Sequence, residues 1–325
     1  MGTGADIEER FGHSAIWIRD SVAHTDLIYN FGTFEVPRGP AGLIVFGAKF
    51  AMGPQRYWLG VDDNIDRELF IYRSRGRDMI AQELNLLPAQ RADLASRLAI
   101  NARDENKYYM YDYFRDNCST RVRDILDIEL GGALKQATLG KPAEGTLRFH
   151  TRRSITNNIF LFVGIDAAFG PRVDRPLDQW DEMFLPEKVQ QRIRSLKVAG
   201  PGGVELPLVA REFPLLTIGA FHVEPKPPQW GGPFFIFGLA IAGLIHLASS
   251  RGSVATVGRV VGGAWMLLMG VGGVILLFFW IFTQHVATWA NHNLLLMSPL
   301  ALLLIPSFWR RRGREPSRWT GVVAM

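Results

Sequence analysis

Residues 260–282 read VVGGAWMLLMGVGGVILLFFWIF, a run without a charged side chain. A helix rises about 1.5 Å per residue, so about 20 apolar residues span the hydrocarbon core of a bilayer. Large apolar side chains would surround a helix of this sequence on every face, which leaves no polar stripe to meet water. The run therefore predicts a transmembrane helix rather than a buried helix of a soluble protein.

Two further apolar runs accompany this segment. Residues 230–248 are interrupted only by His246, and residues 294–309 form a shorter run that contains two prolines. We expect three membrane spans, at about 230–248, 260–282 and 294–309. Residues 1–225 then form an N-terminal domain, and residues 226–325 form a transmembrane domain.

Lysine and arginine placement predicts the orientation of these spans, because positive residues favour the cytoplasmic side. Arg251 and Arg259 lie between the first two runs, whereas residues 283–293 contain no Lys or Arg. The arginines after the last run are Arg310, Arg311, Arg312, Arg314 and Arg318. We therefore expect residues 1–225 and the 283–293 loop to share the periplasmic face of a bacterial inner membrane.

The 283–293 loop contains His285, Asn291, His292 and Asn293. One interpretation is an ordinary polar loop at the membrane interface. The other is the lip of an active site, in which His292 binds a lipid headgroup.

The formal net charge is +5, and a good part of the excess lies in the arginine-rich tail. The N-terminal domain therefore has no basic stripe that would indicate nucleic-acid binding. No intramolecular disulfide is possible, because Cys118 is the single cysteine. The start of the sequence lacks the basic and apolar segments of an export signal, so we expect the natural start to lie upstream.

Apolar periodicity and turn residues predict an α+β domain, an antiparallel sheet with helices against it. The expected strands are residues 13–18, 26–34, 56–61 and 78–86. The expected helices are residues 39–52, 64–74, 87–102, 119–130 and 186–196, with another near Ile159. Pro- and Gly-rich stretches at 200–203 and 225–228 predict the linker into the membrane.

Cys118 lies at the predicted start of a helix, directly after the capping residues Asp116 and Asn117. The free N–H groups and the positive end of the dipole there stabilise an anion, which favours a thiolate. A backbone N–H of the same turn can also stabilise an oxyanion. Cys118 is thus a candidate nucleophile, and the alternative is an inert buried thiol.

A cysteine nucleophile needs a base and a group that orients the base. His13 is the best-placed histidine of the N-terminal domain, because it opens a predicted strand beside Gly12. The orienting group should come from the neighbouring strand. His24, Asp26 and Asn30 are all candidates, and the sequence does not choose among them.

Four blocks of sequence are distinctive. They are Phe11-Gly12-His13-Ser14-Ala15, Tyr29-Asn30-Phe31-Gly32-Thr33-Phe34, Tyr57-Trp58-Leu59-Gly60-Val61 and Tyr111-Asp112-Tyr113-Phe114-Arg115-Asp116-Asn117-Cys118-Ser119-Thr120-Arg121. Together they resemble the periplasmic domain of the Lnb family. The resemblance covers roughly residues 4–200 and extends to the C-terminal spans, and the family includes a bacterial lipoprotein acyltransferase. The order of His before a helical Cys is similar to circularly permuted papain-like enzymes, such as the NlpC-like and lecithin:retinol acyltransferase groups. The resemblance implies Cys118 as nucleophile and His13 as base.

The resemblance implies acyl transfer from a lipid ester through a thioester on Cys118, with phospholipid and lipoprotein substrates. A cell-wall cysteine peptidase or amidase is the alternative enzyme, and a non-catalytic envelope assembly module is the alternative without chemistry. Arg121, Asn117 and His292 are candidate substrate-binding residues. Arg121 could instead pair with Asp124 or Asp127, and Asn117 could act only as a cap. No cofactor or metal is expected, because the sequence has no metal-ligand spacing and no Gly-rich phosphate loop.

Overall fold

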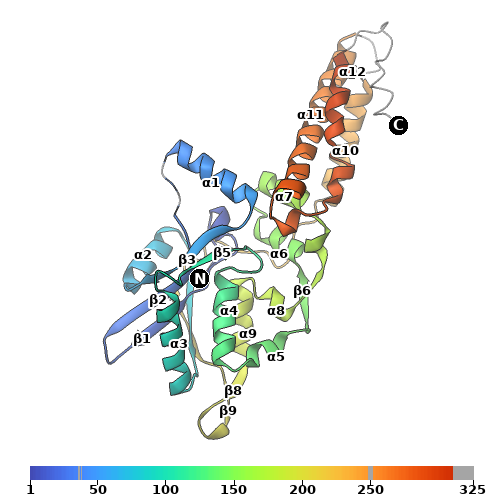
Figure 1. The fold of residues 1–325 in the computed structure, drawn as a ribbon. Helices are drawn as coiled ribbons and strands as arrows, with labels where there is room; N and C mark the ends of the chain where they lie inside the picture. Colours follow the sequence, from blue (N-terminus) through green and yellow to red (C-terminus); the bar gives the residue numbers. More distant parts are fainter. Residues whose placement is uncertain (36, 38, 248–251, 310–325) are drawn as a thin grey trace. The chain divides into compact units, whose positions relative to one another are not determined.

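The computed structural model describes residues 1–35, 37, 39–247 and 252–309 (Figure 1). These residues form two compact units, each described here by itself. The N-terminal unit comprises residues 1–157 and 175–226, and the membrane unit comprises residues 158–174 and the chain from Pro227 onward. The sequence had suggested a single break near residue 225, so the short 158–174 segment is an addition to the membrane unit.

The N-terminal unit is built on an antiparallel sheet of four strands in the order β1-β2-β3-β5 (Figure 1). The strands are β1 (Ile16–Asp20), β2 (Thr25–Thr33), β3 (Gln55–Asp62) and β5 (Tyr108–Tyr111). The predicted strands at 26–34 and 56–61 agree with β2 and β3. The tyrosine-rich run was not predicted as a strand, and it forms the edge strand β5.

The first strand begins later than the predicted residue 13. Gly12 has a φ of +81°, and the His13 N–H donates to the carbonyl of Met1 at 3.0 Å instead of joining the strand ladder. Pairing with β2 starts only at Ile16, opposite Tyr29. His13 therefore lies in an extended segment that leads into β1, not on the strand itself.

The longer helices of the N-terminal unit agree with the predicted ranges within one or two residues. They are α1 (Pro40–Met52), α2 (Ile65–Ser74), α3 (Pro88–Asn101), α4 (Cys118–Glu129) and α9 (Pro186–Ser195). The core lies between the sheet and α3, α4 and α9, where Phe31, Leu59, Leu98, Leu126 and Val189 are almost fully buried. Full burial of each such side chain stabilises the fold by about 1.5–3 kcal/mol, which fixes α4 against β2.

The rest of the N-terminal unit consists of short elements. They are η1 (Ile7–Glu9), β4 (Met79–Leu84), α5 (Ala133–Thr138), β6 (Pro142–Thr146), α6 (Leu147–Ser154), β7 (Pro176–Asp178), α8 (Gln179–Glu182), β8 (Lys197–Ala199), η3 (Pro201–Gly203), β9 (Glu205–Pro207) and β10 (Val209–Leu216). β4, predicted as residues 78–86, pairs with β10 and not with the main sheet. The 200–203 stretch is the turn of the β8–β9 hairpin, so its prediction as a linker was wrong.

The membrane unit contains α10 (Gly231–His246), α11 (Gly252–Phe282), η5 (Val286–Thr288), η6 (His292–Leu295), η7 (Pro299–Leu304) and α12 (Ile305–Trp309). Within the described part of the chain, α11 alone is long and apolar enough to cross a membrane by length and composition. α10 is shorter than the predicted first span, and the predicted third span is mostly 3-10 turns. Arg259, predicted in a loop, lies inside α11; Arg251 and the arginines from Arg310 onward lie outside the described residues.

Glycines on α11 explain how the segment after η6 packs on this helix. A Cβ atom at Gly273 would lie 2.1 Å from the carbonyl oxygen of Met297, and a Cβ atom at Gly270 would lie 2.5 Å from the Leu302 side chain. Only glycine permits such an approach of backbone to a helix, as is common between segments in membranes. The 292–309 segment thus lies against α11 without a regular transmembrane helix of its own.

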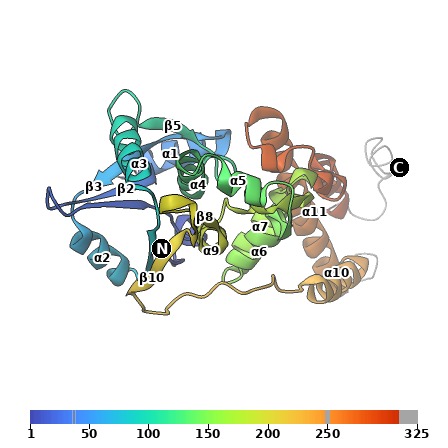
Figure 2. The same cartoon turned by 90° about the horizontal axis from the view of Figure 1, so that it is seen from below.

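The 158–174 segment forms α7 (Ile159–Ala168) and η2 (Pro171–Asp174) and packs on the loop after α11 (Figure 2). The side-chain amides of Asn291 and Asn293 donate to the carbonyl of Ala167 at 2.8 and 2.9 Å. The Gly170 N–H donates to the Ala287 carbonyl at 2.8 Å. These bonds hold the end of α7, so the two loop asparagines have a structural role.

Candidate active site

Cys118 is the first residue of α4, and Asn117 is its N-cap. The Asn117 Oδ1 atom accepts hydrogen bonds from the N–H groups of Ser119 and Thr120 at 2.8 and 2.9 Å. The Thr120 hydroxyl in turn accepts from the Asn117 N–H at 2.8 Å, which completes a capping box. The Asn117 amide nitrogen donates to two backbone carbonyls. The start of α4, and with it the thiol, is therefore rigidly held.

His13 reaches Cys118 because the chain turns sharply at Gly12. A Cβ atom at residue 12 would lie 2.9 Å from the Met1 carbonyl, and the positive φ already favours glycine. The turn directs the extended segment of His13 past the start of α4. There Ser14, the next residue, meets Ser119, the residue after Cys118, with their hydroxyl oxygens 3.3 Å apart.

Asn30 is the candidate orienting group that contacts His13. The Nε2 atom of the ring lies 3.2 Å from the Asn30 Oδ1 atom. Because an amide oxygen only accepts, this contact assigns the proton to Nε2 and leaves Nδ1 for the thiol. Asp26 instead accepts from the Trp17 indole at 2.9 Å, and His24 lies exposed in the β1–β2 turn.

The surroundings of Cys118 favour the thiolate. Burial by itself would raise the pKa of the thiol, but the charge of His13 and a hydrogen bond from its ring oppose burial. The Ser14 N–H and the Ser119 hydroxyl also donate to the sulfur. Together these groups lower the pKa of Cys118 to about 7, so a large share of the thiol is ionised near neutral pH.

Ser14 and Ser119 are site residues that the sequence did not single out. Their hydroxyl oxygens lie 3.3 Å apart, which links the His13 segment to the start of α4. Both residues flank the predicted pair in the sequence, and that adjacency was the available signal. The Ser14 N–H, one of the groups that lower the pKa of Cys118, is also a candidate donor to an oxyanion that forms beside the sulfur.

Two predicted substrate-binding residues of α4 are already engaged within the fold. The Arg121 guanidinium makes a two-pronged contact with the Asp116 carboxylate, with Nη2 and Oδ2 2.6 Å apart. It also lies over the Tyr109 ring, at 4.2 Å from the centroid. The partner is therefore Asp116, and not Asp124 or Asp127. Asn117 has the capping role described above.

The third predicted substrate-binding residue, His292, lies exposed in η6 of the membrane unit. A pocket of about 610 Å³ lies in the same unit beside η6 and η7. Asn293 contributes to its lining, which is otherwise dominated by apolar residues such as Trp265, Met266 and Met297. Such a lining suits an apolar chain better than a charged headgroup.

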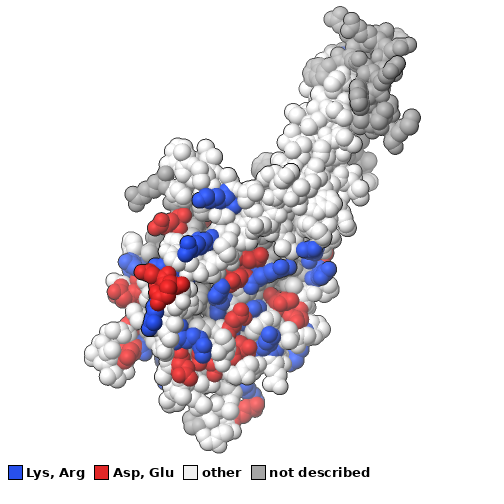
Figure 3. Space-filling view, in the orientation of Figure 1, with Lys and Arg blue, Asp and Glu red and all other residues white. Residues whose placement is uncertain are grey.

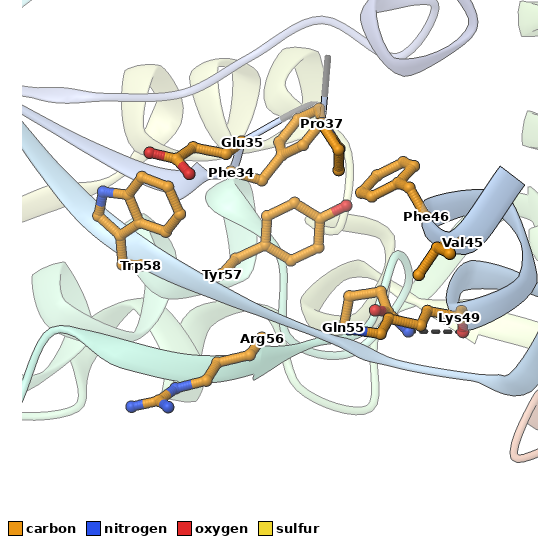
Figure 4. A pocket seen from close by; sticks show the side chains of 10 residues that line it. All are labelled: Phe34, Glu35, Pro37, Val45, Phe46, Lys49, Gln55, Arg56, Tyr57 and Trp58. Atoms are coloured by element: carbon orange, nitrogen blue, oxygen red, sulfur yellow. Dashed lines mark hydrogen bonds between the residues drawn. The ribbon is translucent and has the colours of Figure 1, made fainter. Parts of the chain in front are cut away.

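An aromatic pocket of about 230 Å³ lies in the N-terminal unit between α1 and β3 (Figure 4). Its lining residues are Phe34, Glu35, Pro37, Val45, Phe46, Lys49, Gln55, Arg56, Tyr57 and Trp58. The Phe34 ring contacts the rings of Phe46 and Tyr57, with centroids 6.0 and 4.9 Å apart. The Tyr57 ring in turn lies 4.4 Å from that of Tyr111.

Tyr111 extends this row of rings toward Cys118. Burial raises the pKa of its phenol well above the ordinary value, and the charge of Cys118 is the next largest cause of the rise. The Tyr111 ring also lies 6.4 Å from that of Tyr109, which packs against the core cluster that contains Cys118. Aromatic side chains thus lead from α1 to the core around Cys118.

A second buried group of charges lies around Glu182, which is fully buried. Its carboxylate contacts the His150 ring at 3.1 Å, the Lys188 ammonium at 3.4 Å and the Arg192 guanidinium at 3.0 Å. Despite burial, the His150 hydrogen bond and the Lys188 charge lower the pKa of Glu182 to about 2. This network ties α6, α8 and α9 together and has no contact with the thiol among the described interactions.

No group of three or more His, Cys, Asp or Glu side chains could hold a metal ion within the described residues. Cys118 is the candidate nucleophile of this arrangement, His13 the candidate base and Asn30 the candidate orienting group.

A helix-start thiol in the N-terminal unit and a transmembrane helix in the second unit define a membrane protein with an exposed globular domain. Comparison with protein families specifies the class further. Residues 1–158 match the Lnb N-terminal periplasmic domain, and residues 230–324 match the Lnb transmembrane domain. The chain belongs to the Lnb family, and its N-terminal domain is periplasmic. No curated protein and no solved structure matches the chain.

Proposed function

We propose that this protein is a membrane-anchored cysteine acyltransferase that takes an acyl group from a lipid ester at the outer face of the inner membrane. The observation that carries the proposal is the convergence of three parts: the capped helix start with Cys118, the His13 segment that meets it, and Asn30, which contacts the His13 ring. Membership of a family named for a periplasmic and a transmembrane domain supports a substrate at the membrane surface.

In the first half-reaction the thiol proton moves to Nδ1 of His13, and the thiolate attacks the carbonyl carbon of the ester. The oxyanion that develops accepts hydrogen bonds from N–H groups around the sulfur, with the Ser14 N–H as the nearest candidate. The carbon–oxygen ester bond then breaks. The leaving alkoxide takes the proton from His13, and the acyl group remains on Cys118 as a thioester.

In the second half-reaction an amine or hydroxyl of the acceptor attacks the thioester carbon. His13 removes the proton of the attacking group, the carbon–sulfur bond breaks, and the thiolate is regenerated and reprotonated by His13. An acyl acceptor on a lipoprotein fits a periplasmic active site that is tethered to the membrane. Lipoprotein acyl transfer is therefore the reaction that we propose.

The geometry also supports a permuted papain-like arrangement. Cys118 begins a helix that packs on the sheet, His13 precedes it in the chain beside the first strand, and Asn30 contacts the ring from the second strand. Nucleophile, base and orienting group then have the same roles as in a cysteine protease triad. The similarity to a cysteine protease is therefore one of residue roles. The permuted papain-like fold is itself part of the proposal.

The decisive experiment traps the acyl-enzyme. The full chain, reconstituted in vesicles of phosphatidylethanolamine and phosphatidylglycerol, is acid-quenched and its intact mass is measured. We expect a hydroxylamine-sensitive gain of one acyl group on Cys118, none in Cys118→Ala, and a loss of at least about 100-fold in its rate of formation in His13→Ala. Addition of a lipoprotein with a free acceptor should discharge the adduct.

Two other results would replace this proposal. Hydrolysis of peptidoglycan peptides without any lipid-derived adduct would establish a cysteine peptidase or amidase. No adduct, no hydrolysis and no reaction of Cys118 with iodoacetamide would favour a non-catalytic envelope module.

A further inference from the structure

Helix α1 (Pro40–Met52) presents apolar side chains to solvent on the N-terminal unit. Its sequence, PAGLIVFGAKFAM, contains one charged residue, Lys49. Ile44 is 72% exposed, and Val45, Phe50 and Met52 are also exposed. In the space-filling view the surface over α1 is almost free of charged residues (Figure 3). A soluble protein rarely leaves a helix so uncovered, which indicates a partner that is itself apolar.

We propose that α1 inserts into the outer leaflet of the bilayer that anchors the chain, and that the aromatic pocket beneath it receives an acyl chain on its way to Cys118. The second part rests on the proposed acyltransfer, and the first part does not. α1 would then be an interfacial helix, one that lies in the membrane surface with its apolar residues among the lipid chains.

The membrane in which the chain is anchored is the apolar partner that we assign to α1. The same polypeptide carries the transmembrane helix α11, so the N-terminal unit is always tethered to a membrane. Tethering raises the effective concentration of the lipid surface around α1 without any further contact. With 13 residues, α1 extends over about 20 Å, too short to cross the hydrocarbon core but suited to lie along its surface.

The packing under α1 connects the lipid surface to the thiol. Val45 and Phe46 of α1 both line the aromatic pocket, and the Phe46 ring is stacked on that of Phe34. From there the rings of Tyr57, Tyr111 and Tyr109 continue to the core cluster that contains Cys118, as described above. An acyl chain that follows this row would exchange lipid contacts for aromatic ones and would not cross water.

Gly32 makes the inner end of this row possible. Its φ is +88°, and a Cβ atom there would lie 3.2 Å from the Tyr111 ring. The adjoining register shift in β2, between Phe31 and Thr33, bends the strand at this point. The main sheet is thus locally shaped so that the Tyr111 ring fits next to the rings of Tyr57 and Tyr109.

A spin label tests the insertion of α1 directly. The full chain, in a Cys118→Ala background, carries Ile44→Cys or Phe70→Cys, and each cysteine is labelled with a nitroxide in phosphatidylethanolamine and phosphatidylglycerol vesicles. Phe70 on α2 is the matched control, because it is also 72% exposed and apolar. We expect oxygen to relax the label at residue 44 at least threefold more than a water-soluble nickel chelate does, and the reverse at residue 70.

Two other results of the spin-label experiment would each overturn the insertion of α1 into the bilayer. Equal access of the nickel chelate to both positions would show that α1 lies in water. Protection of residue 44 from both reagents would show that protein covers α1, and dipolar broadening between labels would identify that protein as a second copy of the chain.

A separate measurement tests the delivery of the acyl chain. Ile44→Asp should slow acylation of Cys118 from vesicle lipids at least tenfold, whereas Phe70→Asp should not, and the rate of alkylation by iodoacetamide reports whether the site is folded. Equal acylation in both variants would overturn acyl delivery by α1. If the label inserts but even the unaltered chain forms no adduct, the acyltransferase proposal fails and the membrane helix stands.

Discussion

The Nε2 atom of His13 lies 3.2 Å from the Oδ1 atom of Asn30, and this contact explains much of the chemistry that the site can perform. An amide orients the imidazole without adding a negative charge next to it. The positive charge of protonated His13 is then opposed only weakly by its orienting partner and acts on the thiol. This is consistent with a Cys118 thiol that is buried and nevertheless has a lowered pKa.

The first prediction concerns ionisation of the nucleophile. The rate of alkylation of Cys118 by iodoacetamide should rise with pH around a midpoint of about 7, because the thiolate is the reactive form. In His13→Ala the midpoint should move upward, since burial would then act without the charge and hydrogen bond of the ring. A pH profile of alkylation in the two proteins measures both values. An unchanged midpoint in His13→Ala would show that the ring does not stabilise the thiolate.

The second prediction concerns Asn30. Asn30→Ala removes the acceptor of the Nε2–H and frees the ring to rotate, so acylation of Cys118 should slow about 10- to 100-fold, as on loss of other groups that orient a functional histidine. The loss should appear in the rate constant at saturating lipid, and not in the lipid concentration that gives half the maximal rate. Asp26→Asn is the control on the same strand, because Asp26 contacts Trp17 instead. Equal loss in the control would mean that strand β2, rather than the amide, is responsible.

The third prediction concerns the buried charges around Glu182. Glu182→Gln leaves the buried Lys188 with only the exposed Glu144 carboxylate as counter-charge, and should destabilise the N-terminal unit by up to about 3–5 kcal/mol. Glu205→Gln is the control, since the exposed Lys197–Glu205 pair contributes about 0–1 kcal/mol. Chemical denaturation followed by near-UV circular dichroism measures both. Similar small losses in the two variants would contradict a stabilising role for the network.

The same network predicts a pH dependence. The pKa of Glu182 is lowered in the folded protein to about 2, from an ordinary value of 4.5. Its contribution to stability is therefore complete above about pH 4.5 and is lost as pH falls toward 2, because the unfolded chain binds the proton first. The stability difference between the unaltered protein and Glu182→Gln should shrink over this range.

Local sequence patterns predicted the helices and strands whose positions depend only on neighbouring residues. The periodicity of apolar residues predicted α3 and α4, and the strand-like runs at 26–34 and 56–61 predicted β2 and β3 at the centre of the sheet. The tyrosine-rich β5 was missed because its edge position depends on pairing with β3, far away in the chain. The pairing of β4 with β10 was missed for the same reason.

The site was predictable to the extent that it is local. Asp116-Asn117-Cys118 is a helix start that can be read directly, and the block around His13 carries the family resemblance. Asn30 could not be separated from Asp26 and His24, because all three lie in or beside the same strand and only the three-dimensional course of the chain before β1 decides which one meets the ring.

The last prediction concerns the orientation of the membrane unit. Arg259 lies within α11, yet residues 260–282 still extend over about 34 Å, enough to cross the hydrocarbon core of about 30 Å. Arg259 would then lie near the cytoplasmic end of the helix, where its side chain can reach the headgroups. We predict that α10 also crosses, inward from the periplasmic N-terminal domain, so that α11 crosses outward and the 283–293 loop is periplasmic. Alkaline phosphatase, which is active only outside the cytoplasm, should be active when inserted after Gln284 and inactive when fused after Arg314. Activity only in the second fusion would show that the apolar segments after residue 230 cross the membrane in a different number or order.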